Sequence, residues 1–63
     1  MKMTIRAARV NAGLTQAETE KATGISKRSI CAYESGKRSP TLKTLSRLCE
    51  VYGCGIDDIK ILP

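Results

Sequence analysis

Residues 15–35 read TQAETEKATGISKRSICAYES, and this stretch decides the fold because it carries the signals of two short helices joined by a tight turn. The first four residues, Thr15-Gln-Ala-Glu18, form a capping box, in which the Thr15 hydroxyl and the Glu18 carboxylate each accept a hydrogen bond from the other residue's amide. We expect this helix to run from Gln16 to Thr23. Gly24 then ends it, because glycine readily adopts the left-handed backbone that closes a helix.

The turn Thr23-Gly24-Ile25-Ser26 leads into the next helix. Ile25 is the apolar residue that we expect to be buried in the turn, and Ser26 is a favourable N-cap. The helix should span Lys27 to Ser35 and end at Gly36. Its predicted inward residues are Ile30 and either Tyr33 or Glu34, and its outward residues share one face: Lys27, Arg28, Cys31 and Ala32.

The rest of the chain also has helical spacing of its apolar residues, and no alternating strand pattern persists. We expect a helix from about Thr4 to Asn11, with Ile5 and Ala8 inward and Gly13 as its stop. Thr41 should cap another helix that continues to about Tyr52. This helix carries the strongest apolar stripe of the sequence: Leu42, Leu45, Leu48, Cys49 and Tyr52.

The final segment, from Ile56 to Leu62, predicts a short fifth helix with Ile56 and Ile59 packed against the others. With 63 residues, the chain is near the lower limit for folding on one hydrophobic core. The sequence therefore predicts an all-α fold, a single domain over residues 1–63.

The positive charge is concentrated in one part of the chain. The net charge is +5, and the window from Lys27 to Arg47 holds six basic residues against one acid, Glu34, whereas five basic and five acidic residues lie outside it. A modest charge run is usually a solvated face, but an excess this localised fits a surface that meets phosphates.

Lys27 and Arg28 stand where acids are normally favoured, because the helix dipole is positive at its N-terminus. Cations at this position indicate a role towards a partner outside the protein. An arginine can bond two acceptors of guanine in the major groove, and a lysine can contact them less rigidly.

Several function classes are disfavoured. The chain has no His and no clustered carboxylates, so we expect no enzyme, no metal site and no cofactor, and no small-molecule ligand is evident. A disulfide between Cys49 and Cys54 is possible, but free thiols, Cys31 included, fit a reducing cytosol better. Without a membrane span or signal peptide in the sequence, we expect a cytoplasmic protein.

A set of short motifs runs through the chain in register: Gln16-x-Glu18, Gly24-Ile25-Ser26, Ile30, Tyr33-Glu34-x-Gly36-Lys37-Arg38-x-Pro40 and Leu42-x-x-Leu45. Together they resemble the phage repressor/Cro-type helix-turn-helix family, over roughly Ile5 to Ile59. The resemblance implies a compact five-helix, lambda-repressor-like domain whose third helix enters the major groove of double-stranded DNA.

The resemblance also implies roles for individual residues. It implies base reading by Lys27, Arg28 and Ala32, and an internal ion pair between Arg9 and Glu34. Gln16 should in addition brace the recognition helix. The residues that match contacts to backbone phosphates are Gln16, Ser26, Lys37 and Arg38.

Two residues depart from the family pattern. Thr19 stands where the family usually has Leu, and Glu20 where it has a small residue at a close helix crossing. A buried, unpaired carboxylate would be costly there. We therefore expect the Glu20 stem to cover the crossing and its head to lie near Lys27 or Arg28.

For three outward residues, the sequence leaves two roles open. Lys43 and Arg47 are either solvated or in contact with the DNA backbone. Cys31 is either a neutral neighbour on the outward face or a residue with a role of its own, as a thymine-methyl contact or a thiol sensor.

The function that these features predict is sequence-specific transcriptional regulation, with repression of a bacterial, phage or mobile-element promoter as the expected outcome. We expect a homodimer on an inverted repeat, with any exposed surface near Tyr52, Cys54 and Ile61 as the dimer patch. The alternative is an antitoxin-like protein-interaction module that keeps the fold with little DNA binding of its own.

Overall fold

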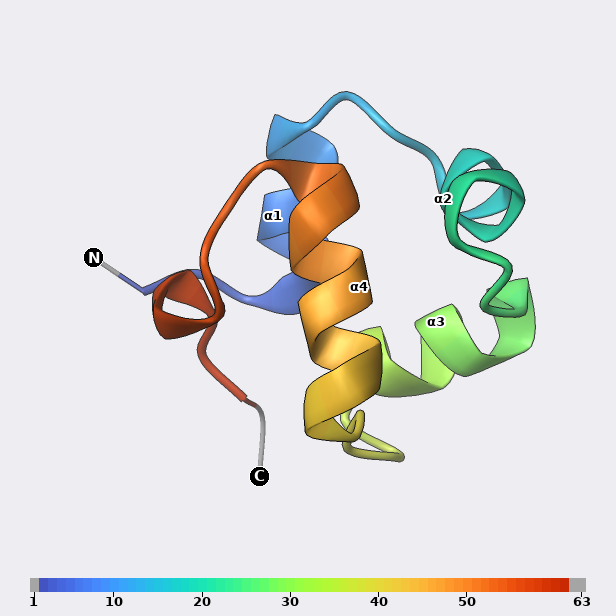
Figure 1. The fold of residues 1–63 in the computed structure, drawn as a ribbon. Coiled ribbons are helices and arrows are strands. Elements are labelled where there is room, and N and C mark those ends of the chain that lie inside the picture. The colour runs from blue at the N-terminus through green and yellow to red at the C-terminus, as the bar shows by residue number, and fades with distance from the viewer. Residues whose placement is uncertain (1, 62–63) are drawn as a thin grey trace.

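The computed structural model describes residues 2–61, which form four α-helices and one 3-10 turn (Figure 1). Helix α4 runs through the middle of the molecule and contacts α1, α2 and the 3-10 turn η1, whereas α3 packs against α1 and α2. Within this range, no helix is both long and apolar enough to cross a membrane. The elements are α1 (Ile5–Asn11), α2 (Gln16–Thr23), α3 (Lys27–Ser35), α4 (Leu42–Tyr52) and η1 (Ile56–Asp58).

Each α-helix begins at a hydroxyl side chain that accepts a hydrogen bond from the amide three residues later. The capping box of α2 is present. The Thr15 amide donates to Glu18 Oε1 at 2.8 Å, and the Glu18 amide donates to Thr15 Oγ1 at 3.0 Å. These caps fix the helix starts that the sequence predicts. The four N-caps are Thr4, Thr15, Ser26 and Thr41.

The turn between α2 and α3 is held by the last residue of α2. Gly24 has φ +78°, and its amide donates to the Glu20 carbonyl at 2.8 Å. The Thr23 hydroxyl donates to the Thr19 carbonyl at 2.7 Å and accepts from the Ile25 amide at 3.1 Å. Ile25 is half-buried and packs against the core. The turn therefore has a defined geometry that aims α3.

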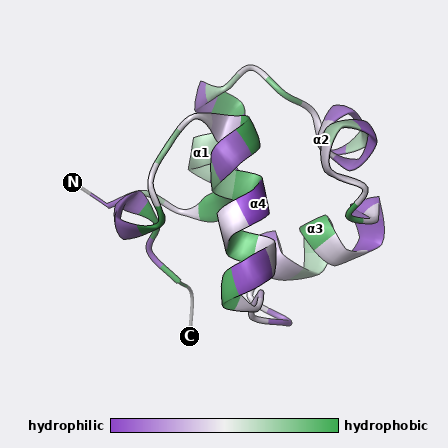
Figure 2. Cartoon of the chain, viewed as in Figure 1, coloured by the Kyte–Doolittle hydropathy of each residue, from purple (hydrophilic) through white to green (hydrophobic). Residues whose placement is uncertain are grey.

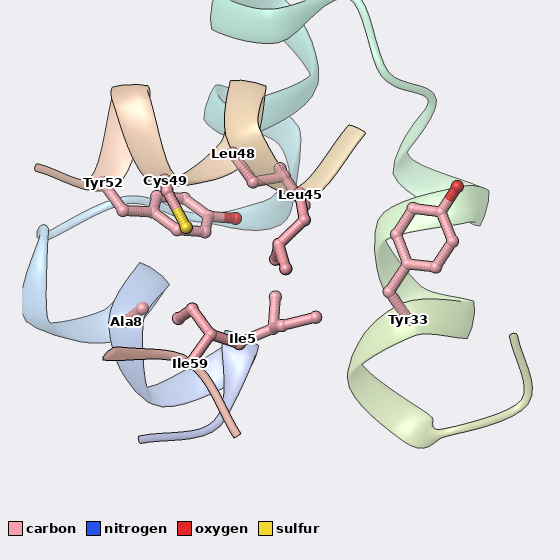
Figure 3. Packing of buried hydrophobic residues seen from close by; sticks show 8 residues of the cluster. All are labelled: Ile5, Ala8, Tyr33, Leu45, Leu48, Cys49, Tyr52 and Ile59. Atoms are coloured by element: carbon pink, nitrogen blue, oxygen red, sulfur yellow. The ribbon is translucent and has the colours of Figure 1, made fainter. Parts of the chain in front are cut away.

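The core lies between α1 and α4, and it is closed by residues from α3 and the C-terminal segment (Figure 3). Hydrophobic and hydrophilic residues alternate along α4, as the colours of Figure 2 show. Ile30 and Leu48 are fully buried. The main cluster consists of Ile5, Ala8, Tyr33, Leu45, Leu48, Cys49, Tyr52 and Ile59.

The prediction of the apolar stripe on α4 is wrong at one position. Leu42 is 71% exposed, although its spacing puts it on the same helix face as Leu45. It is the first residue of α4, where the helix extends beyond the core. On α3, the sequence left open whether Tyr33 or Glu34 is the second inward residue. Both are, because Tyr33 and the side chain of Glu34 are buried.

The predicted fifth helix, from Ile56 to Leu62, is also wrong over the residues that the structure describes. Only the single turn η1 forms, and Asp58 Oδ2 closes it by accepting from the Gly55 amide at 2.9 Å. Ile59 then becomes extended and forms a parallel bridge with Met3, with the Lys60 amide donating to the Met3 carbonyl at 2.7 Å. The N-terminal segment thus satisfies the backbone groups that a helix would have paired.

The two isoleucines of this segment differ in burial. Ile59 is buried as predicted, whereas Ile56 is 36% exposed. Leu62 lies outside the described residues.

Candidate nucleic-acid interface

The outward face of α3 forms the floor of a shallow groove that also includes the start of α2 and the loop after α3. We call this surface the recognition groove. It brings together the three predicted base-reading residues, Lys27, Arg28 and Ala32, with Gln16 and Lys37 from the predicted phosphate contacts. The complete lining is Gln16, Lys27, Arg28, Cys31, Ala32, Ser35 and Lys37.

The recognition groove combines long cations with a floor of small side chains. Lys27, Arg28 and Lys37 are exposed, whereas Ala32 is half-buried. Small residues in the middle of the helix face let a base edge approach closely, and cations at its ends can reach guanine acceptors or phosphates. The hydrophilic start of α3 stands out in Figure 2. This arrangement suits an α-helix that lies in the major groove of DNA.

Ser26 takes part in the local structure of α3 and does not line the recognition groove. Its Oγ accepts from the Ser29 amide at 3.1 Å and lies 3.0 Å from Ser29 Oγ. The side chain thus serves as the N-cap. Ser26 is an exposed residue at the start of the helix.

Arg38 lies along the side of α3, outside the recognition groove. Its guanidinium donates to Ser29 Oγ at 3.3 Å and to the Tyr33 hydroxyl at 3.4 Å, and its central carbon stands 5.2 Å from the centre of the Tyr33 ring. These contacts hold an exposed cation beside the N-terminal half of α3. Lys37 and Arg38 therefore point to different faces of the helix.

Glu20 is close to Lys27, but it contacts the main chain instead of the ammonium group. The Lys27 amide donates to Glu20 Oε1 at 3.0 Å, and Glu20 is exposed. Helix α3 has no acid in its own first turn. A carboxylate from α2 thus supplies the negative charge that the positive end of the α3 dipole favours. The carboxylate is satisfied without burial.

Glu34 connects three helices behind the recognition groove. Arg9 of α1 donates to both carboxylate oxygens, with Nε–Oε2 at 2.7 Å and Nη2–Oε1 at 3.1 Å. Gln16 of α2 donates to Oε1 at 3.1 Å. The side chains of Arg9 and Glu34 are only 12% and 6% exposed, and the hydrogen bond to Glu34 raises the pKa of Arg9. Gln16 thus braces α3 through Glu34.

Arg47 has a structural partner that sequence reasoning missed. Its Nη1 donates to the Thr23 carbonyl at 3.3 Å, at the C-terminus of α2. The available signal was general, because helix ends leave carbonyl groups without partners and attract cations. Nothing in the sequence identifies α4 as the helix that supplies one. Arg47 therefore ties α4 to the turn before α3.

Thr19 is fully buried, at the position where the family usually has Leu. Its hydroxyl donates to the Thr15 carbonyl at 2.9 Å, one turn back on α2. Such a bond satisfies a buried hydroxyl within the helix itself. The buried hydroxyl is thus satisfied within α2.

The cysteines are free and differ in their surroundings. Cys31 is exposed in the recognition groove, Cys49 is buried, and Cys54 is half-buried. Burial raises the pKa of the Cys49 thiol to about 11. Across residues 2–61, the structure has no group of three His, Cys, Asp or Glu side chains that could hold a metal ion.

Comparison with known proteins identifies the family. The sequence profile described as "Helix-turn-helix" matches residues 5–59. The chain is 38% identical over 55 residues to the cryptic phage CTXphi transcriptional repressor RstR of Vibrio cholerae, covering 87% of this chain and 50% of that repressor. It therefore spans only half the length of that relative.

Two further relatives match over almost their whole length. An uncharacterized HTH-type transcriptional regulator of Methanocaldococcus jannaschii is 36% identical over 61 residues, covering 97% of this chain and 92% of that protein. One from Archaeoglobus fulgidus is 33% identical over 61 residues, covering 97% and 87%. No solved structure gives a significant match. The chain therefore belongs to the helix-turn-helix family of DNA-binding domains, as its resemblance to the phage repressor/Cro type predicted.

Proposed function

We propose that this protein is a sequence-specific transcriptional regulator that reads a duplex operator with α3 in the major groove. The observation that carries this proposal is the recognition groove, where Lys27, Arg28 and Ala32 share one helix face with Gln16 and Lys37 beside it. The names of the relatives, a phage repressor and two HTH-type transcriptional regulators, support this function, and the first of them favours repression.

Two kinds of contact divide the work. Lys27 and Arg28 read base edges, and Ala32 leaves room for the groove edge, with a thymine methyl as its natural neighbour. Phosphate contacts on both sides fix the register of the helix. They come from Gln16, Ser26, Lys37 and Arg38, four residues that surround α3.

A homodimer on an inverted repeat completes the proposal. One short helix covers few base pairs, and two-fold symmetric pairs of such helices read two half-sites one helical turn apart. The exposed apolar residues near the C-terminal segment, Ile56 and Ile61, support a dimer contact there. Tyr52 of the predicted patch is buried in the core, so it is not part of this contact. We place the regulator in the cytoplasm, where its free thiols stay reduced.

Selection of bound sequences from a random duplex pool tests the proposal. We expect an inverted repeat to be enriched, and we expect Arg28→Lys and Ala32→Ser each to change the selected bases at a defined position. Lys21→Gln is the matched control, because Lys21 is exposed and does not line the recognition groove. A pool with no enriched sequence at low salt would overturn the proposal and favour a partner-binding module.

A further inference from the structure

A second hollow adjoins the recognition groove on the side of α1. Arg6 from α1 lies along its wall, and Gln16, Lys27, Cys31 and Ser35 line both hollows. The two hollows therefore form one continuous surface across α1, α2 and α3. We call the second one the α1 cleft.

The charges of the α1 cleft leave a positive excess. The cleft contains Arg9 and Glu34, which neutralise each other in their ion pair. Arg6 and Lys27 remain, and both are exposed. Within residues 2–61, the guanidinium of Arg6 forms no side-chain hydrogen bond or ion pair. An arginine that is held by nothing in its own chain, in a positive cleft, is available to an anionic partner.

The position of the cleft identifies that anion. If α3 lies in the major groove, the two sugar-phosphate backbones run along its sides, because the groove is only about 12 Å wide. The recognition groove already faces one side through Lys37. The α1 cleft adjoins the recognition groove on the side of α1 and is not lined by Lys37, so in this arrangement it would face the other backbone.

We propose that Arg6 contacts a backbone phosphate of the bound duplex and extends the DNA interface onto α1. This inference rests on the proposed function. It adds a residue outside the window from Lys27 to Arg47 in which the net positive charge is concentrated. Because phosphates are present at every base step, the contact strengthens binding and fixes register without selecting a sequence.

The salt dependence of binding tests this contact. The unmodified protein, Arg6→Gln, Arg6→Lys and Lys21→Gln are titrated onto a labelled mixed-sequence duplex of about 20 base pairs between 50 and 200 mM salt. The association constant K falls with salt, and losing one phosphate contact makes the negative slope of log K against log salt shallower by about 0.9. We expect this shallower slope for Arg6→Gln. Over this salt range, its loss of affinity should be about 3.5-fold smaller than that of the unmodified protein. Arg6→Lys should restore the slope, and Lys21→Gln should keep it.

The outcomes separate this inference from the proposed function. Binding by the unmodified protein with an unchanged slope for Arg6→Gln would overturn the Arg6 contact and leave the proposed function standing. An equal change of the salt slope for Arg6→Gln and Lys21→Gln would also overturn the Arg6 contact, because it would reflect overall charge alone. If the unmodified protein binds no duplex at 50 mM salt, the proposed function itself fails. Coincident thermal melting curves for all four proteins are expected, since both positions are exposed.

Discussion

At the scale of single residues, the recognition helix is held in place by side chains of the other helices. Glu34 accepts from Arg9 and Gln16, Glu20 accepts from the first amide of α3, and Arg47 donates to the end of α2. Together these bonds join α3, or the turn before it, to α1, α2 and α4. The direction in which Lys27 and Arg28 point therefore depends on charges placed elsewhere in the sequence.

The Arg9–Glu34 pair gives the first prediction. Arg9→Met leaves the carboxylate of Glu34, only 6% exposed, without its cation, and we expect a loss of about 3 kcal/mol in the free energy of unfolding. Urea unfolding measures it. The double variant Arg9→Met/Glu34→Met is the control and should be more stable than Arg9→Met, because it removes the unpaired charge. A single variant as stable as the unmodified protein would contradict this account.

Glu20 gives a second prediction at this scale. Glu20→Ala removes the acceptor of the Lys27 amide and the negative charge at the start of α3, so it should lower the free energy of unfolding by about 0.5 kcal/mol. Glu20→Gln keeps an acceptor oxygen and should lose less. Paired urea titrations compare the two variants. The role assigned to Glu20 would be wrong if Glu20→Ala were the more stable of the two.

At the scale of elements, the local signals in the sequence were sufficient for most helix limits. Hydroxyl caps, the Thr15–Glu18 box and Gly24 all act within one helical turn, so they can be read without knowing the fold. The predicted fifth helix failed because its alternative was non-local. Pairing with Met3, more than fifty residues earlier, decided that the chain becomes extended at Ile59.

The residues of the candidate site were likewise predictable only in part from the sequence. The helical period alone puts Lys27, Arg28 and Ala32 on one face of α3. The resemblance to the family supplied Gln16, Lys37 and the Arg9–Glu34 pair, which periodicity could not reveal. The bond of Arg47 and the position of Arg6 needed three-dimensional packing, because they depend on which helices become neighbours.

The α2–α3 turn gives the third prediction. Gly24 has φ +78° and open space where the methyl group of an alanine would lie, so Gly24→Ala meets backbone strain without a steric clash and should cost about 1 kcal/mol. Gly55→Ala is the matched control, since Gly55 has φ −91° and a methyl group there makes only ordinary contacts. Thermal melting compares the two variants. Equal stability of both would refute the importance of the left-handed turn.

At the scale of the whole molecule, the core is small and includes two titratable groups whose pKa values are raised by burial. Burial raises the pKa of Cys49 to about 11 and also raises the pKa of Tyr52. Both groups are neutral in the folded core, where ionisation is disfavoured. Their contribution to stability is therefore complete at neutral pH and is lost in alkali.

The fourth prediction follows from these pKa values. An unfolded Cys49 thiol ionises near its ordinary pKa of 9.0, whereas the folded one ionises at about 11, so stability falls as the pH rises from 9 towards 11. The loss attributable to Cys49 should reach about 1 kcal/mol by pH 10. Urea midpoints at pH 8 and pH 10 measure it. Cys49→Ala should show a smaller decrease between the two, and an identical decrease would contradict the assignment.

The recognition groove and the α1 cleft form one continuous, positive surface beside α3, and the proposed function depends on whether that surface binds DNA. The most direct measurement is the affinity of the unmodified protein and of Arg28→Glu for one labelled duplex at 50 and 200 mM salt. We expect binding that weakens steeply with salt for the unmodified protein, and none for folded Arg28→Glu, because a carboxylate in the recognition groove repels the duplex. Equal binding by both proteins, or none by either at 50 mM salt, would contradict the account.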